Sequence, residues 1–104
     1  MVKYAAFVAK QPQMSREDFE ANWLGGHASI VRRFPNLRKY TITFLEEGSE
    51  VGWDGYAELW FDSEEDLQFA LDSELWSVEA AADRLHWMGP HISAPVKAEH
   101  QIIP

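Results

Sequence analysis

The sequence predicts an α+β fold, in which a four-stranded antiparallel sheet carries its helices on one face. Two observations predict it. Strand-like and helix-like segments follow one another in the order βαββαβ, and the long helical segment has one apolar face. With 104 residues and no internal repeat or linker, we expect one domain spanning residues 1–104.

The first strand and the first helix have clear signals. Residues 2–10 are β-branched, aromatic and alanine-rich, which predicts a strand, and residues 11–14 form a loop. Ser15 is the expected helix N-cap because acidic residues follow it, and Pro35 ends the helix. The apolar face recurs at three- and four-residue steps and contains Phe19, Trp23, His27, Ile30, Val31 and Phe34.

The remaining elements follow in order. Residues 37–45 predict the second strand, and residues 56–61 predict the third after the polar turn that starts at Glu46. Ser63 caps a second helical region that restarts near residue 73 and continues to about Leu85. Beyond a break at Gly89-Pro90, we expect the last strand over residues 96–103.

The third strand is apolar or aromatic on both faces. Ala57, Leu59 and Phe61 lie in one phase, while Tyr56 and Trp60 lie in the other. Helices cover only one face of such a sheet, and an open face normally alternates with polar residues. We therefore expect a second copy of the chain to cover the other face, giving a homodimer.

Composition narrows the classes of partner. A formal net charge of −8 argues against nucleic acid, which needs clustered Lys and Arg. No segment approaches the ~20 apolar residues of a membrane span, and the start of the chain does not resemble a signal peptide, so we expect a cytoplasmic location without a membrane partner. There is no cysteine, and the four histidines lack metal-ligand spacing, so we expect neither metal nor cofactor.

His27 is the leading candidate for chemistry. It lies on the apolar face of the first helix and follows Gly25 and Gly26, each of which costs a helix interior roughly 1 kcal/mol relative to alanine. Two interpretations are open. His27 is either a core histidine bonded to a carbonyl, or a titratable group beside a cavity for which the glycines leave room.

For two further candidate residues, a purely structural role is the alternative to a role in the site. Tyr40 lies in the strand that follows the helix, so an inward ring would reach the same cavity as His27, but tyrosines are also common in half-buried strands. Glu58 lies between two aromatic residues and needs a partner if it is buried. Lys97, His100 or an arginine would serve as that partner.

For several other residues the sequence is compatible with either a packing role or a functional role. His86 follows Asp83 by three residues, which permits a local contact, and surface exposure is the alternative. Whether His86, His91 or His100 reaches a pocket stays open at this point. The tryptophans are expected in the core or an interface, with one or two lining a pocket; they are Trp23, Trp53, Trp60, Trp76 and Trp87.

Several stretches occur together in order along nearly the whole chain. They are Ser15-x-Glu17-x-Phe19-x3-Trp23-x3-His27, Phe34-Pro35-x-Leu37-x2-Tyr40, the run DGYAELWF over residues 54–61, and Glu99-His100. Together they resemble the EthD-like family of dimeric α+β barrels. The resemblance implies a ferredoxin-like monomer whose sheet packs against the sheet of a second copy.

The resemblance also implies a type of chemistry. Characterised relatives include methylmuconolactone methylisomerase, which rearranges a lactone without metal or cofactor, and polyketide cyclases and dehydratases. A histidine and a tyrosine implicated in the isomerase match His27 and Tyr40. Leu59 stands where the isomerase carries a cysteine, so the same rearrangement is not expected here.

Our hypothesis is a cofactor-free enzyme that acts by proton transfer on a small apolar carbonyl compound, such as a lactone, dienoate or polyketide. It would catalyse isomerisation, cyclisation or elimination, with His27 as general acid or base and Tyr40 as donor to an enolate oxygen. Residues expected to contact the substrate are Trp23, Gly26, Glu58, Leu59 and His86. The alternatives are a barrel-type quinol monooxygenase or haem-binding protein, and a non-catalytic binding protein of a degradation pathway.

Overall fold

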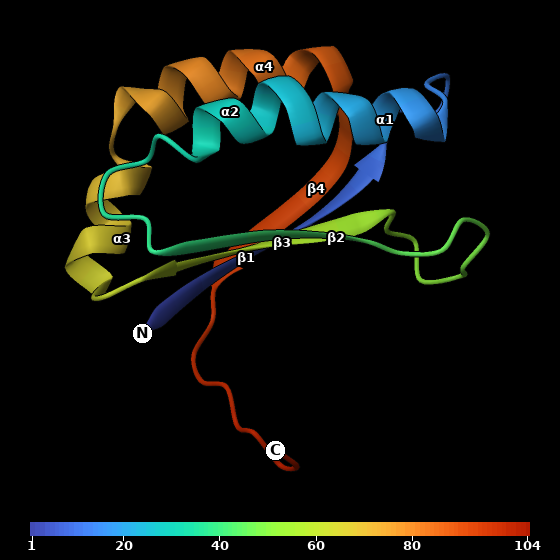
Figure 1. Ribbon diagram of the computed structural model, residues 1–104. Helices are drawn as coiled ribbons and strands as arrows, with labels where there is room; N and C mark the ends of the chain where they lie inside the picture. Colours follow the sequence, from blue (N-terminus) through green and yellow to red (C-terminus); the bar gives the residue numbers. More distant parts are fainter.

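The computed structural model describes all 104 residues as one antiparallel sheet with helices on one face (Figure 1). The strands are β1 (Val2–Lys10), β2 (Lys39–Phe44), β3 (Gly55–Phe61) and β4 (Met88–Pro95), in the spatial order β2-β3-β1-β4. Each neighbouring pair is antiparallel. The predicted α+β class and the order of elements are therefore confirmed.

The first helical region begins where its cap predicts. The Ser15 side chain accepts a hydrogen bond from the Asp18 backbone N–H at 3.1 Å. The region then consists of α1 (Arg16–Asn22), a π-helical turn (Trp23–His27) and α2 (Ala28–Val31). The predicted helix is thus present, but its centre is a π turn that contains both glycines.

The second helical region crosses the same face of the sheet. It consists of α3 (Glu64–Leu71), a π-helical turn (Leu75–Ala80) and α4 (Ala81–Trp87). In Figure 1, α1 and α2 follow each other end to end over the sheet with α4 alongside them, and α3 lies at one end of the sheet. None of these helices is both long enough and apolar enough to cross a membrane.

The core lies between the helices and the sheet. Its largest fully buried side chains are Trp23, Trp87, Phe19, Phe61 and Val8, which come from both layers. The rings of Trp23 and Trp87 lie 5.5 Å apart, a contact that joins the two helical regions.

The prediction for the last strand was wrong. The strand is Met88–Pro95, and residues 96–104 form no strand or helix. Gly89 does not interrupt the strand, because β4 runs through it. It brings two backbones together, because a Cβ there would lie 2.5 Å from the Lys10 carbonyl oxygen. Pro90 is tolerated because β4 is an edge strand.

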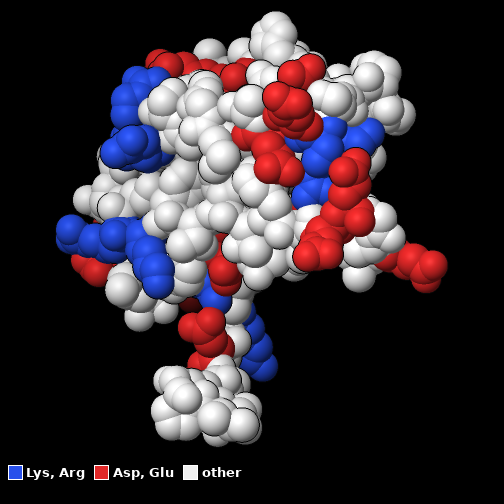
Figure 2. Space-filling model, turned by 45° about the vertical axis from the view of Figure 1, so that its right-hand side comes forward, with Lys and Arg blue, Asp and Glu red and all other residues white.

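The face of the sheet opposite the helices carries aromatic residues. The Phe7 ring lies 5.7 Å from the Tyr56 ring and 6.2 Å from the Trp53 ring, and Phe7 and Ile92 are exposed. The C-terminal segment leaves the sheet on this side and extends away from it (Figure 1). Figure 2 shows Lys and Arg side chains in separate groups among acidic and uncharged ones, with no continuous basic patch on the face drawn.

Candidate active site between the helices and the sheet

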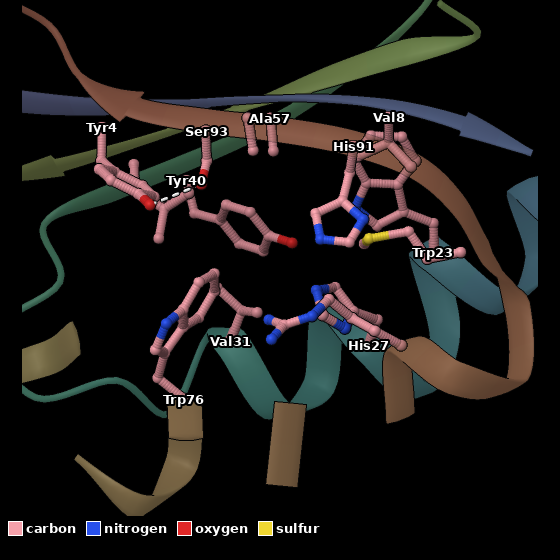
Figure 3. Close-up of a pocket in the computed structure, with 14 residues that line it drawn as sticks. Tyr4, Val8, Trp23, His27, Val31, Tyr40, Ala57, Trp76, His91 and Ser93 are labelled. Atoms are coloured by element: carbon pink, nitrogen blue, oxygen red, sulfur yellow. Dashed lines mark hydrogen bonds between the residues drawn. The ribbon is translucent and has the colours of Figure 1, made fainter. Parts of the chain in front are cut away.

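A cavity of about 90 Å³ lies between the helical layer and the sheet (Figure 3). By this measure a single water needs roughly 10–15 Å³, so the cavity holds several heavy atoms. Ten of its fourteen lining residues are hydrophobic. An apolar cavity with a few convergent polar groups is the usual form of a small-molecule site.

The floor of the cavity is made by small residues on three adjacent strands. Ala6 of β1 pairs with Ala57 of β3 on one side and with Ser93 of β4 on the other. All three line the cavity. Their short side chains leave room for the cavity, and the larger side chains of Tyr4 and Val8 in β1 line it on either side of Ala6.

His27 enters the cavity from the helical side and is held by Asp83 of α4. The His27 Nδ1 atom lies 2.9 Å from Asp83 Oδ2, and His27 is 5% exposed. The same carboxylate oxygen accepts a hydrogen bond from Trp87 Nε1 at 2.8 Å. Because a carboxylate accepts only, Nδ1 carries the proton and Nε2 is the unprotonated nitrogen of a neutral ring.

Burial keeps the His27 ring neutral. Desolvation lowers the pKa of His27 below its usual value of about 6.5, although the Asp83 hydrogen bond raises it, and the nearby Arg84 charge lowers it further. The cost of burying a charge therefore outweighs the partial compensation from Asp83. At neutral pH His27 is a base with a free nitrogen.

The π turn explains how His27 comes to face inward. Phe19, Trp23, His27 and Val31 are all buried and stand four residues apart. In an α-helix each four-residue step overshoots a full turn by about 40°, so three steps would rotate Val31 by about 120° from Phe19. A π turn has more residues per turn and absorbs this overshoot. The strict four-residue spacing was the sequence signal for it.

Tyr40 reaches the cavity from the sheet. Its hydroxyl points into the cavity toward the His91 ring, opposite His27 (Figure 3). Burial raises the pKa of Tyr40 well above its usual value. The hydroxyl therefore keeps its proton and is available as a hydrogen-bond donor.

The corrected last strand brings two more polar residues to the cavity. His91 and Ser93 of β4 pair with Val8 and Ala6, and both line the cavity. Ser93 Oγ lies 2.7 Å from the Tyr4 hydroxyl, and His91 Nδ1 lies 3.2 Å from the Gly89 carbonyl oxygen. Sequence reasoning left the role of His91 open and missed Ser93 because it placed the strand after them, although polar residues at alternating positions were a signal.

Arg84 of α4 is the charged residue that sequence reasoning did not single out. It lines the cavity, and its Cζ atom lies 4.5 Å from the centre of the Trp76 ring. Its Nη1 atom is buried and has no hydrogen-bond partner. Burial lowers the pKa of Arg84, yet the guanidinium pKa starts so high that the group stays charged at neutral pH.

The structure brings four of the predicted site residues together. His27, Tyr40, Trp23 and Leu59 all line the cavity. Trp23 and Leu59 contribute apolar walls from the helical and sheet layers, respectively. Trp76 also lines it, as expected for one or two of the tryptophans.

Three other predicted contact residues lie outside the cavity. Glu58 lies on the opposite face of the sheet and binds Lys3 at 2.8 Å, a partner that sequence reasoning did not name. His86 is exposed, and Asp83 bonds to His27 rather than to His86. Gly26 is exposed, and a Cβ there would meet only Asp83 Oδ1 at 3.5 Å. The glycines therefore do not open the cavity, which corrects that explanation of their presence.

The described side chains do not gather three His, Asp or Glu residues into a possible metal-binding group. The polar atoms at the cavity instead belong to one imidazole–carboxylate pair, one guanidinium, a second imidazole and three hydroxyl groups. This set suits the transfer of protons and the binding of oxygen atoms.

The fold and the cavity define a ferredoxin-like α+β protein with a small-molecule-sized site under its helices. Residues 11–91 match the EthD domain family, and this match covers most of the sequence. The chain belongs to the EthD family. No curated protein matches it at a significant level.

Solved structures support the fold. An EthD family protein from Bacillus halodurans is 20% identical, with a TM-score of 0.77, over 95% of this chain and 100% of that one. A dimeric ferredoxin-like protein of unknown function from Thermobifida fusca is 12% identical, with a TM-score of 0.71, over 91% and 88%. SnoaB, a cofactor-independent oxygenase from Streptomyces nogalater, is 16% identical, with a TM-score of 0.64, over 97% and 94%.

Proposed function

We propose that this chain is a cofactor-independent enzyme that moves protons on a small, largely apolar carbonyl compound. The observation that carries the proposal is the contact between His27 Nδ1 and Asp83 Oδ2 at the wall of an apolar cavity. It fixes the tautomer of a neutral imidazole and leaves Nε2 as a base. A carboxylate behind an imidazole also stabilises the imidazolium that forms when the base takes a proton.

The first step is proton removal. His27 Nε2 takes a proton from the carbon next to the substrate carbonyl, and the electron pair of the broken C–H bond forms an enolate. Asp83 stabilises the resulting imidazolium, and the Tyr40 hydroxyl donates a hydrogen bond to the enolate oxygen. Such a donor contributes roughly 3 kcal/mol when it is aimed at developing charge in a site that excludes water.

The fate of the enolate sets the product. Return of the proton to a different carbon gives isomerisation. Loss of a hydroxyl group from the neighbouring carbon, protonated by His27, gives elimination of water. Attack of the enolate carbon on a second carbonyl of the same molecule gives cyclisation, and the imidazolium then protonates the new alkoxide. Trp23 and Leu59 supply the apolar walls that hold the substrate and exclude water.

The test is solvent exchange. Wild-type protein is incubated in D₂O with a panel of small lactones, dienoates and diketones, and deuterium entry next to the carbonyl is followed by NMR. Catalysed exchange on at least one compound supports the proposal. Compounds that bind without any exchange would instead favour a non-catalytic binding protein.

A second candidate is a cofactor-independent oxygenase, and the similarity to SnoaB favours it. The same base would deprotonate a phenol or quinol in the cavity, and the electron-rich anion would react with molecular oxygen. Uptake of oxygen with such a substrate, lost on replacing His27, would select this candidate over carbonyl chemistry.

We also propose that a second copy covers the open face of the sheet. The exposed side chains of Phe7 and Ile92 and the half-buried rings of Tyr56 and Trp60 lie on this face. A structural neighbour with the same fold is described as dimeric. Burial of this surface contributes roughly 25 cal/mol per Å² of apolar area.

A further inference from the structure

Arg84 differs from Arg16, the other partly buried arginine of the chain. Arg16 bonds to Glu20 and Asp54 at 3.0 and 3.4 Å. Arg84 forms no salt bridge, and its buried Nη1 has no hydrogen-bond partner. The neighbouring Asp83 forms no hydrogen bond or salt bridge with Arg84, and its Oδ2 atom accepts from His27 and Trp87 instead.

A buried N–H donor on a charged group is costly when it has no hydrogen-bond partner, so the position of Arg84 Nη1 requires an explanation. The centre of the Trp76 ring lies 4.5 Å from Arg84 Cζ, and this cation–π contact compensates part of the cost. The ring supplies no oxygen acceptor, so Arg84 Nη1 still lacks a hydrogen-bond partner. Arg84 and Trp76 both line the cavity.

We propose that Arg84 is the binding site for a carboxylate, so that the ligand of this cavity is a small apolar acid with a flat carbon skeleton. A guanidinium donates two parallel hydrogen bonds to a carboxylate, a match that no other side chain at the cavity provides. The aromatic walls from Tyr4, Trp23 and Trp76 suit a flat skeleton. The net charge of −8 makes general attraction of anions unfavourable, so a local cation is needed.

The proposal deepens the proposed function and rests on it only for the orientation of the substrate. Arg84 lies close enough to His27 to lower the pKa of that imidazole. A carboxylate bound at Arg84 therefore places the carbon skeleton beside His27. The substrate class would be unsaturated or aromatic acids that also carry the reacting carbonyl.

The test uses probes of matched shape and different charge. Benzoate and 2-naphthoate are compared with benzamide and 2-naphthamide by calorimetry and by quenching of tryptophan fluorescence. Wild type is expected to bind at least one acid tenfold or more tightly than its amide. Arg84→Gln is expected to bind the acids at least tenfold more weakly and the amides equally, and Arg84→Lys is expected to fall between them.

Controls separate this proposal from the catalytic one. Arg32→Gln removes an exposed arginine with no assigned partner and is expected to leave binding unchanged. His27→Asn is expected to abolish proton exchange while keeping the acid preference, so failure of either proposal is seen separately. Circular dichroism checks that Arg84→Gln is folded. Equal binding of acid and amide by wild type, no binding of either acid, or unchanged acid binding by Arg84→Gln would each overturn the assignment.

Discussion

The Nδ1 atom of His27 and the Oδ2 atom of Asp83 lie 2.9 Å apart, although the two residues are 56 positions apart in the chain. The contact joins the first helical region to α4 above the cavity. It fixes the tautomer of His27 and provides a negative charge for the imidazolium. Each property is open to a separate measurement.

Replacing Asp83 by asparagine tests the charge alone. The amide oxygen of Asp83→Asn can still accept from both ring N–H groups, so we expect the fold to persist. Loss of the negative charge lowers the pKa of His27 further, and turnover should fall by roughly 10- to 100-fold. NMR titration of the His27 ring and a rate assay measure the two effects. Asp62→Asn, which alters only an exposed pair with Arg38, is the control and should change neither.

Stability should depend on pH through His27. Its pKa is lower in the folded protein than in the unfolded chain, so the unfolded chain binds the proton more readily. The contribution of His27 to stability is complete above about pH 6.5 and is lost as the pH falls from there through the folded pKa. The free energy of unfolding, measured with urea between pH 5 and 8, should therefore rise with pH, and His27→Gln should reduce this rise. The same pH dependence of stability in that variant as in wild type would contradict this account. His86→Gln, at an exposed position, is the matched control.

Tyr40→Phe separates chemistry from packing. The substitution keeps the ring and removes only the hydroxyl that points into the cavity (Figure 3). We expect turnover to fall by about a hundredfold and the melting temperature to stay within a degree or two. Tyr56→Phe, on the open face of the sheet, should leave turnover intact. A Tyr40→Phe variant with full activity would exclude Tyr40 from the reaction.

Two glycines should respond in opposite ways to alanine. A Cβ at Gly89 would lie 2.5 Å from the Lys10 carbonyl oxygen, so Gly89→Ala forces β1 and β4 apart and should be clearly destabilising. A Cβ at Gly26 meets only Asp83 Oδ1, at an ordinary distance of 3.5 Å. Gly26→Ala should therefore gain up to about 1 kcal/mol and keep activity. Chemical denaturation measures both, and a destabilised Gly26→Ala would show that the π turn itself requires glycine.

The open face of the sheet should hold two chains together. Light scattering at micromolar concentration should give a mass twice that of one chain. Phe7→Glu, which puts a charge among exposed aromatic side chains, should shift the protein toward the monomer, whereas exposed Phe69→Glu on α3 should not. A stable wild-type monomer would contradict the proposal that a second copy covers this face.

Local patterns were sufficient for most of the fold. The β-branched and aromatic composition of the first three strands and serine caps at residues 15 and 63 predicted elements that the structure contains. The last strand failed because Gly89 and Pro90 are read as a break unless it is known that the strand lies at an edge. That depends on strand order, which is a property of the whole sheet.

Only part of the site was predictable from the sequence, because the rest also depends on how distant elements pack together. His27 and Tyr40 stand on periodic faces, so their inward direction followed from spacing. The Asp83 and Arg84 side chains gain their importance from the packing of α4 against the first helical region, which no local pattern shows. Glu58 looked functional because it lies between two aromatic residues, but it is paired with Lys3 of the adjacent β1 strand.

The central claim is that His27 transfers the proton, and His27→Asn tests it most directly. The asparagine amide can still donate to Asp83, so the fold and the binding of ligand should survive, as monitored by circular dichroism and calorimetry. On a compound for which wild type catalyses deuterium exchange from D₂O, we predict that the variant loses at least a hundredfold in exchange rate. A folded His27→Asn protein that exchanges as fast as wild type would contradict the account.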